Sequence, residues 1–416
     1  MATIDKSLPN TMTEVEIPGE EEIVEAKEEA VEEISSDGQT EIEMDEEGGA
    51  TINFDPGEVN PEGGEDHDAN LADFLEDNVL DPLASELMEK YTNYKQSRQE
   101  WADSYREGLN LLGFKYVTRT EPFRGASSVT HPVLAEAVTQ FQAQAYKELL
   151  PADGPVRTQI MGDANVAKEE QSKRVKDFMN YQIMDQMKEY EPEFDQMLFY
   201  LPLSGSTFKK VYYDDLLGRA VSKFIPAEDL VVPYSATSLE DAEAVIHVIR
   251  MSQNDLRKQQ INGFYRDIDL GEPPVQEDKL KQKELELEGI QQNGTEDVYT
   301  ILEMHVDVDL EGHEDVNPED GEPTGIKLPY IITIDEANEK VLSIRRNYAP
   351  EDPLKKKKDY FVHFKFLPGL GFYGLGLIHM IGGLSRTATV ALRQLLDAGT
   401  LANLPAGFKT RGVRMR

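Results

Sequence analysis

The C-terminal segment, residues 360–416, constrains the fold of this chain more than any other. It begins with an aromatic and β-branched run at residues 360–367, which is typical of a strand. A glycine-rich stretch follows, and the pattern then predicts a long amphipathic helix over Leu377–Asn403. Apolar residues recur along this helix at spacings of three and four and therefore share one stripe: Ile378, Ile381, Leu384, Ala388, Leu392 and Leu395.

The same predicted helix carries a charged face. Arg386 and Arg393 share that face, and Asp397 follows Arg393 by one helical turn, within its reach. A helix with an apolar stripe and a separate charged face needs partners on two sides. One side can be its own domain, which leaves the other side for a different surface.

Three interpretations compete for the turn that contains Gly369, Gly371, Gly374 and Gly376. The first three glycines fit a dinucleotide-binding fingerprint, with Asp397 as the acidic residue that follows. That fingerprint needs the acid at the end of a second strand, whereas Asp397 falls inside the predicted helix. We therefore expect no cofactor at this turn.

The second interpretation is a membrane span, because residues 366–385 contain no Asp, Glu, Lys or Arg. A spanning helix needs about 20 continuous apolar helical residues. This stretch contains Pro368 and six glycines, and its periodicity continues past Arg386. A tight structural turn that feeds a long packed helix, the third interpretation, fits better, because glycine permits a sharp strand-to-helix reversal.

Residues 1–80 are predicted to form an acidic, disordered tail. Residues 1–70 hold 23 Asp and Glu against the two lysines Lys6 and Lys27, a net of −21 out of −37 for the whole chain. Such a segment cannot bury enough apolar surface to offset its chain entropy. A solvated tail is the simpler interpretation, and an acidic docking segment for a basic partner is the alternative.

The remaining sequence predicts an α+β fold in three regions. Residues 81–220 are mainly helical, and one stripe predicts a single amphipathic helix up to about Gly108: Leu87, Tyr91, Tyr94, Arg98, Trp101 and Tyr105. Residues 221–350 predict strands and a hairpin of residues 330–334 with 340–345, and Ser252 is a candidate N-cap of a short helix. A charged insertion at 277–294 is expected to be an exposed helix or a flexible segment. Residues 351–416 contain a basic loop, the glycine turn and the long helix.

No residue pattern indicates catalysis or a metal centre. The chain has no cysteine, which excludes disulfides and thiolate metal sites. His131 lacks the companions of a catalytic triad, so a helix-capping loop is the simpler interpretation. The string from Asp307 to Gly312 begins like a calcium loop, but Pro318 stands where a bidentate Glu is required. The four lysines at 355–358 could contact phosphates, although such clusters are more often solvated or paired.

Several markers, taken in order, carry a resemblance to a known family. They are residues 122–128 (PFRGASS), a helix that ends at 149–151 (LLP), residues 226–233 (PAEDLVVP), residues 239–247 (LEDAEAVIH), the glycine turn 369–376 and residues 395–405 (LLDAGTLANLP). With this ordered set, residues 81–416 resemble the portal protein of short-tailed, podovirus-type bacteriophages.

The resemblance implies a homo-oligomeric ring, usually a dodecamer, at one capsid vertex of the virion, assembled in the host cytoplasm. The terminase large subunit and later a tail adaptor protein dock on such a ring, capsid and scaffolding proteins surround it, and double-stranded DNA passes through its channel. It implies no catalytic residue and no cofactor. The helical and hairpin regions would form a wing and residues 377–403 a stem-type helix, with Arg386, Arg393 and Asp397 as candidates for the subunit interface.

Family chains normally continue past this helix with clip and stem elements, so we expect residues 1–416 alone to give monomers or heterogeneous oligomers. A conduit for DNA must not hold phosphates tightly, and a net charge of −37 suits passage rather than storage. The alternative function is a nucleic-acid-associated scaffold or a membrane-bound assembly protein. A nucleotide-dependent enzyme is the third.

Overall fold

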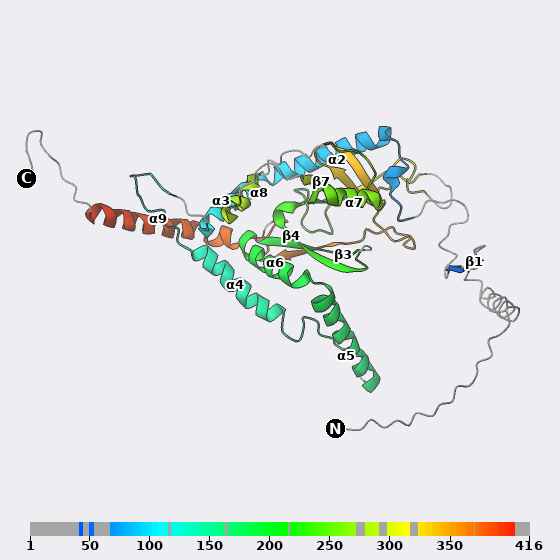
Figure 1. Ribbon diagram of the computed structural model, residues 1–416, viewed down its shortest axis with the longest axis horizontal. Helices are drawn as coiled ribbons and strands as arrows, with labels where there is room; N and C mark the ends of the chain where they lie inside the picture. The colour runs from blue at the N-terminus through cyan, green and yellow to red at the C-terminus, as the bar shows by residue number, and fades with distance from the viewer. Residues whose placement is uncertain are drawn as a thin grey trace, which may run out of the picture. The chain divides into compact units, whose positions relative to one another are not determined.

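The computed structural model describes residues 41–44, 50–53, 67–114, 118–162, 165–214, 217–271, 279–290, 298–316, 323–369 and 371–403. The chain divides into two units, Met1–Ala69 and Asn70–Arg416. In the first unit, β1 (Glu41–Met44) and β2 (Ala50–Asn53) form an antiparallel hairpin, which the expectation of a disordered tail did not include. The other residues of the predicted tail up to residue 66 lie outside the described residues. The second unit is a mixed α+β fold, as the sequence predicts (Figure 1).

The larger sheet of the second unit has five antiparallel strands in the order β5-β6-β7-β8-β9. They are β5 (Leu230–Val231), β6 (Ala244–Ser252), β7 (Val298–Val308), β8 (Leu328–Asp335) and β9 (Lys340–Arg346). The predicted hairpin is confirmed, with Tyr330 paired to Arg346 and Asp335 to Lys340. All but one residue of β8 are buried, which shows that both faces of the sheet are covered at this strand.

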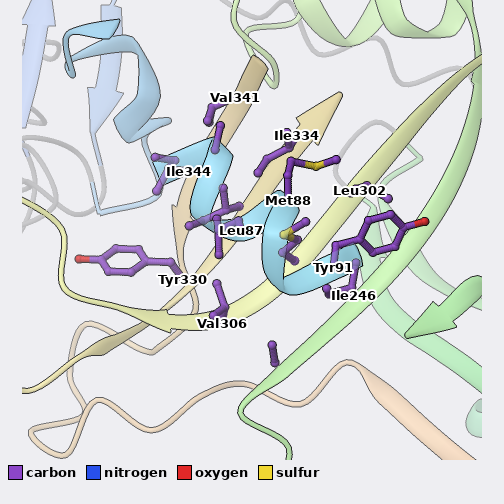
Figure 2. Close-up of a cluster of buried hydrophobic side chains, with 14 of the residues drawn as sticks. Leu87, Met88, Tyr91, Ile246, Leu302, Val306, Tyr330, Ile334, Val341 and Ile344 are labelled. Atoms are coloured by element: carbon purple, nitrogen blue, oxygen red, sulfur yellow. The ribbon is translucent and has the colours of Figure 1, made fainter. Parts of the chain in front are cut away.

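Helix α2 (Asp77–Ser97) covers one face of this sheet. Figure 2 shows Leu87, Met88 and Tyr91 of α2 against sheet side chains that include Leu302 and Ile344. The buried residues of α2 recur at spacings of three and four, so they form a single face. This apolar contact between helix and sheet is the largest hydrophobic cluster among the described residues.

The prediction of one helix up to Gly108 is wrong, because the helix breaks at Arg98 and α3 (Gln99–Leu109) follows. At the break, the Arg98 guanidinium reaches the 3₁₀ turn η4 (Ala227–Asp229). Its Nη1 donates to the carbonyl oxygens of Ala227 and Leu230, each at 2.8 Å, and its Nη2 donates to that of Glu228. These hydrogen bonds pair the backbone carbonyls of an irregular segment about 130 residues further along the chain. The spacing of residues around Arg98 gives no sign of such a distant partner, so it could not predict the break.

A second antiparallel sheet has the strand order β10-β3-β4. Its strands are β3 (Ser206–Asp214), β4 (Arg219–Pro226) and β10 (Phe361–Lys365). Helix α6 (Tyr190–Ser204) packs on β3 and β4, and α4 (Val133–Leu149) and α9 (Leu377–Asn403) pack on α6. Helix α5 (Val166–Tyr181), with a π-helical continuation (Gln182–Gln186), precedes α6. The bounds of α9 agree with the prediction. Helix α7 (Gln253–Ile261) is capped as predicted, since the Ser252 hydroxyl accepts from the Asp255 amide at 3.2 Å.

The charged insertion contains a helix, as one of the two predicted forms has it, but one face of this helix is buried rather than exposed. Helix α8 (Lys279–Glu288) lies inside it, and its Leu280 and Glu284 side chains are buried. Leu280 and Leu287 pack in one apolar cluster with Tyr105 of α3. The two leucines are seven residues apart, so they share one helical face, and that face is hidden among many charged residues in the sequence.

The predicted regional boundaries also change. The compact unit begins at Asn70 rather than at 81, because Leu71 and Ala72 are fully buried and Asn70 is bonded to β9. The Asn70 side chain accepts from the Ile344 amide at 2.9 Å and donates to the Leu342 carbonyl. Residues 81–220, 221–350 and 351–416 belong to this one unit, in which β10 pairs with β3.

A buried ionic network joins the two sheets of this unit. Lys210 of β3 contacts both carboxylate oxygens of Glu303 of β7 at 2.6 Å, and His305 Nε2 lies 2.8 Å from Glu303 Oε1. Burial alone would raise the pKa of Glu303, but the Lys210 charge and the His305 hydrogen bond hold it well below its ordinary value. His247 of β6 lies beside this network, and burial lowers its pKa to about 3.

We expect His247 to weaken the fold as the pH falls. Its folded-state pKa is depressed, so the unfolded chain takes up a proton below the ordinary value of 6.5 while the folded chain does not. Stability should fall by about 1.4 kcal/mol per pH unit from this residue alone. Urea unfolding of wild type and His247→Leu between about pH 6.5 and pH 5 measures the difference, and a variant with an unchanged pH slope contradicts the assignment.

Candidate functional site: the glycine turn and helix α9

Strand β10 leads into a closed loop that precedes α9. The Leu375 amide donates to the Leu367 carbonyl at 2.8 Å, which brings the two ends of the loop together. The tip of the loop is aromatic: the Phe372 ring stacks 5.8 Å from Phe208, and the Tyr373 ring stacks 4.8 Å from Trp101. These contacts anchor the tip in the apolar cluster beneath it.

The glycines of this loop lie where two stretches of backbone touch. Gly205 ends α6 in the left-handed conformation, with φ of +89°. A Cβ on Gly374 would lie 2.4 Å from the Gly205 carbonyl oxygen, and a Cβ on Gly376 would lie 2.4 Å from the Leu203 carbonyl oxygen. The Gly374 amide donates to the Ser206 hydroxyl at 2.7 Å. The turn is therefore packed directly on the α6–β3 corner.

The four predicted turn glycines are not equivalent. A Cβ on Gly369 would lie 2.7 Å from the Tyr373 carbonyl oxygen, so this position is also crowded. A Cβ on Gly371 would meet no described atom within 4 Å, and its φ is not left-handed. The argument from backbone geometry thus applies to Gly369, Gly374 and Gly376 and does not apply to Gly371.

The glycines Gly374 and Gly376 lie directly against the backbone at Gly205, whereas the glycines of a dinucleotide fingerprint face the phosphates. Strand β10 is the edge of an antiparallel sheet, which is not the parallel βαβ arrangement of a dinucleotide site. The apolar stretch 366–385 is divided between the loop and the first part of α9. Among the described helices, none is both long and apolar enough to cross a membrane.

The first half of α9 packs into its own unit through small residues. Its buried side chains are Ile378, Ser385 and Thr389, together with Gly382. Ile378 lies against Gly108 of α3, where an added Cβ would come within 2.3 Å of it. The predicted apolar stripe is only partly used, because Ile378 is buried while Leu384 is 66% exposed and Leu395 71% exposed. The buried face is marked in the sequence by small residues at helical spacing, Gly382, Ser385 and Thr389, and not by the large apolar residues that defined the predicted stripe.

Two of the three charged residues of α9, Arg393 and Asp397, bind a loop of the same chain. Asp397 Oδ1 accepts from the Ser127 amide at 2.6 Å, and Arg393 Nε donates to the Val129 carbonyl at 2.6 Å. Arg393 Nη2 also donates to the Thr130 hydroxyl at 3.2 Å. The loop 127–131 is therefore held along α9 by these two side chains, with the Thr389 hydroxyl accepting from the His131 amide at 3.0 Å.

Arg386 differs from Arg393 in this respect. Its side chain is exposed and has no hydrogen bond or ion pair with any described residue. Of the three predicted interface residues, Arg386 alone thus keeps its charged group available to a partner. Arg393 and Asp397 bond the loop individually, and the structure contains no direct hydrogen bond between them among the described contacts.

The exposed surface of α9 is instead an uncharged apolar stripe, which we call the α9 stripe. Its members are one to two helical turns apart and lie away from the buried face: Met380, Leu384, Ala391, Leu395, Ala398 and Ala402. A second unpartnered surface, the α5 face, consists of Val175, Phe178 and Met179, and no residue of α5 is buried. Figure 1 shows α5 and the C-terminal part of α9 extending away from the two sheets of their unit.

The other candidate binding groups are engaged within the chain or dispersed. Lys355 Nζ lies 2.6 Å from Asp315, and Lys357 Nζ donates to the Leu239 and Glu240 carbonyls. Among the described residues, no group of three or more acidic, His or Cys side chains is placed to hold a metal ion. Asp307 of the calcium-like string lies in β7, and Pro318 lies outside the described residues.

No protein-family model matches the chain. No curated protein matches it either.

Gly374→Ala should destabilise the unit, because the added methyl group would clash with the Gly205 carbonyl. We expect a loss of about 1–3 kcal/mol in the free energy of unfolding, as for overpacking in general. Gly371→Ala is the matched control and should change the free energy of unfolding by less than about 0.5 kcal/mol. Urea denaturation of both variants decides the matter, and equal stabilities would contradict the close backbone contact.

Arg393→Ala should loosen the loop 127–131 without unfolding the unit. Hydrogen bonds from a charged group contribute about 1.5–3 kcal/mol, so the loop amides should exchange with solvent at least tenfold faster. Arg386→Ala on the same helix should leave their exchange unchanged. Hydrogen exchange read by mass spectrometry distinguishes the two, and protection that survives Arg393→Ala would show that the loop is held by other contacts.

Proposed function

We propose that this chain is the subunit of a portal ring, a homo-oligomeric and usually dodecameric assembly at one vertex of a phage capsid. The proposal rests on the ordered resemblance of residues 81–416 and on one structural observation. The unit that begins at Asn70 carries two uncharged apolar helical surfaces, the α5 face and the α9 stripe, which no described residue covers. Apolar surfaces of this kind mark sites of protein contact.

Two different surfaces on one chain favour a head-to-tail contact between copies. If the α9 stripe of one copy packs on the α5 face of the next, the contact is heterologous, and its repetition closes a ring when the rotation permits. A contact of one surface with itself would give a dimer and leave the other surface exposed. Both surfaces are helical stripes, which pack by interdigitating their ridges and grooves.

The remaining partners in this proposal come from the resemblance: the terminase large subunit, the tail adaptor protein, capsid and scaffolding proteins, and double-stranded DNA in the channel of a virion. The charge of the chain supports the role of DNA, since a net charge of −37 keeps phosphates from being held tightly. Lys355 and Lys357 also support this role, because both ammonium groups bind partners within the chain and are not free to bind DNA phosphates.

A pair of single-cysteine variants tests the contact, because the natural chain has no cysteine and each new thiol is unique. Phe178→Cys and Leu395→Cys chains are mixed and oxidised, and each is also oxidised alone. We expect a disulfide adduct that joins one copy of each variant, since residues 178 and 395 face each other only across the proposed contact. Denaturing electrophoresis and mass spectrometry identify the adduct.

Phe178→Cys mixed with Arg386→Cys is the matched control, because Arg386 is exposed on another face of α9. An adduct with residue 395 but not with residue 386 supports the proposed packing. Efficient joining of two Leu395→Cys chains would show that α9 pairs with itself, which contradicts a head-to-tail ring.

A further inference from the structure

Two carboxyl groups from distant parts of the chain meet in the interior of the unit. Glu228 belongs to the turn η4 and Glu284 to α8, and their residues are only 8% and 7% exposed. Arg98 holds η4 in place through its backbone carbonyls, and Leu280 and Leu287 hold α8 against Tyr105 of α3. The meeting of the two carboxyl groups is thus built into the packing of three elements.

The hydrogen-bond donors around this pair are too few. Glu284 Oε2 lies 3.2 Å from Lys281 Nζ, but Glu284 Oε1 and Glu228 Oε2 are buried with no donor among the described residues. The two side chains are within hydrogen-bonding reach of each other. Two ionised carboxylates cannot bond to each other, because both only accept. One proton between them satisfies both oxygens at once.

The surrounding charges also favour a bound proton. Burial first, and then the charges of Glu284 and Asp229, raise the pKa of Glu228 well above its ordinary value. Arg250 of β6 lies 2.8 Å from Asp229 and compensates part of that charge. The other ionisable groups that face the pair are Lys281 of α8, Tyr105 of α3 and Tyr200 of α6.

We propose that one proton shared by Glu228 and Glu284 fastens α8 to the turn η4 and helix α3, and that loss of this proton as the pH rises releases α8. Release leaves two adjacent negative charges, which repel each other in a site with little water. It uncovers Tyr105 and the apolar cluster that Leu280 and Leu287 now cover. That cluster includes Ile378, so the released state exposes the surface on which α9 begins.

The direction of the pH effect follows from the shift. A carboxyl group whose folded-state pKa is raised stabilises the docked state below its ordinary pKa, and this stabilisation is lost as the pH rises through the raised value. Between the ordinary and the raised value the docked state holds one proton more than the released state, so the equilibrium constant for α8 release should increase about tenfold per pH unit over that interval and level off above the raised value.

Three measurements on the full chain test the switch. Difference infrared spectra of wild type minus Glu228→Gln report a protonated carboxyl group, and hydrogen exchange reports the protection of the α8 amides. Trp101 is the only tryptophan, and its ring stacks 5.7 Å from Tyr105, so its emission reports the uncovering of the cluster. We expect the carboxyl band, the α8 protection and the Trp101 emission to change together as the pH rises.

Glu284→Gln should abolish the switch, because its amide group donates to Glu228 without needing a proton. Glu288→Gln, an exposed position on the same helix, should leave the titration unchanged. The absence of a Glu228-dependent protonated carboxyl band at every pH above the ordinary glutamate pKa of 4.5 would overturn the shared proton. Three further outcomes would overturn the switch. The carboxyl band titrates while the α8 amides stay protected, or the band persists until the lysines titrate. In the third, the Glu284→Gln chain still releases α8 as the pH rises.

Discussion

The contact between two stretches of backbone at Gly205 is the constraint on which the rest of the C-terminal half depends. Gly205 is required twice, once because α6 ends there in the left-handed conformation and once because Gly374 and Gly376 approach its backbone. The neighbouring Ser206 hydroxyl bonds the Gly374 amide, and the Phe366 amide bonds the Gly205 carbonyl. One small region thus sets where α6 ends, where β10 pairs and where α9 starts.

The direction of α9 follows from this contact and decides which of its faces are buried. The helix leaves the turn with Ile378 against Gly108 and with Gly382, Ser385 and Thr389 facing inward, because only small side chains fit so close to a neighbouring helix. Arg393 and Asp397 then meet the backbone of the loop 127–131. The large apolar residues Leu384 and Leu395 are left on the outside, where their exposure requires an explanation other than the packing of their own unit.

Sequence patterns predicted the elements whose causes are local. The bounds of α9, the β8–β9 hairpin and the Ser252 cap all follow from periodicity, turn residues and side-chain capping within a few positions. The break at Arg98, the burial of α8 and the faces of α9 could not be predicted in this way. Each depends on a partner more than a hundred residues away: the carbonyls of η4 for Arg98, Tyr105 for Leu280 and the loop 127–131 for Arg393. Periodicity shows that a helix has a stripe, but it does not show which stripe the rest of the chain will cover.

The placement of charged groups also determines which forces could hold two copies of the chain together. Charged groups on and beside the C-terminal helix are largely bonded within the chain, as for Arg393, Asp397 and Lys355, so they offer few ion pairs to a second copy. The α9 stripe, in contrast, has no charge along its length. If copies associate through it, the attraction comes from removing apolar surface from water, which ionic strength hardly weakens. The net negative charge of each copy opposes association, and salt screens that repulsion over about 10 Å. The proposed contact would therefore combine a short-range apolar attraction with a long-range electrostatic repulsion, and only a close, well-packed fit between the two stripes would overcome the repulsion.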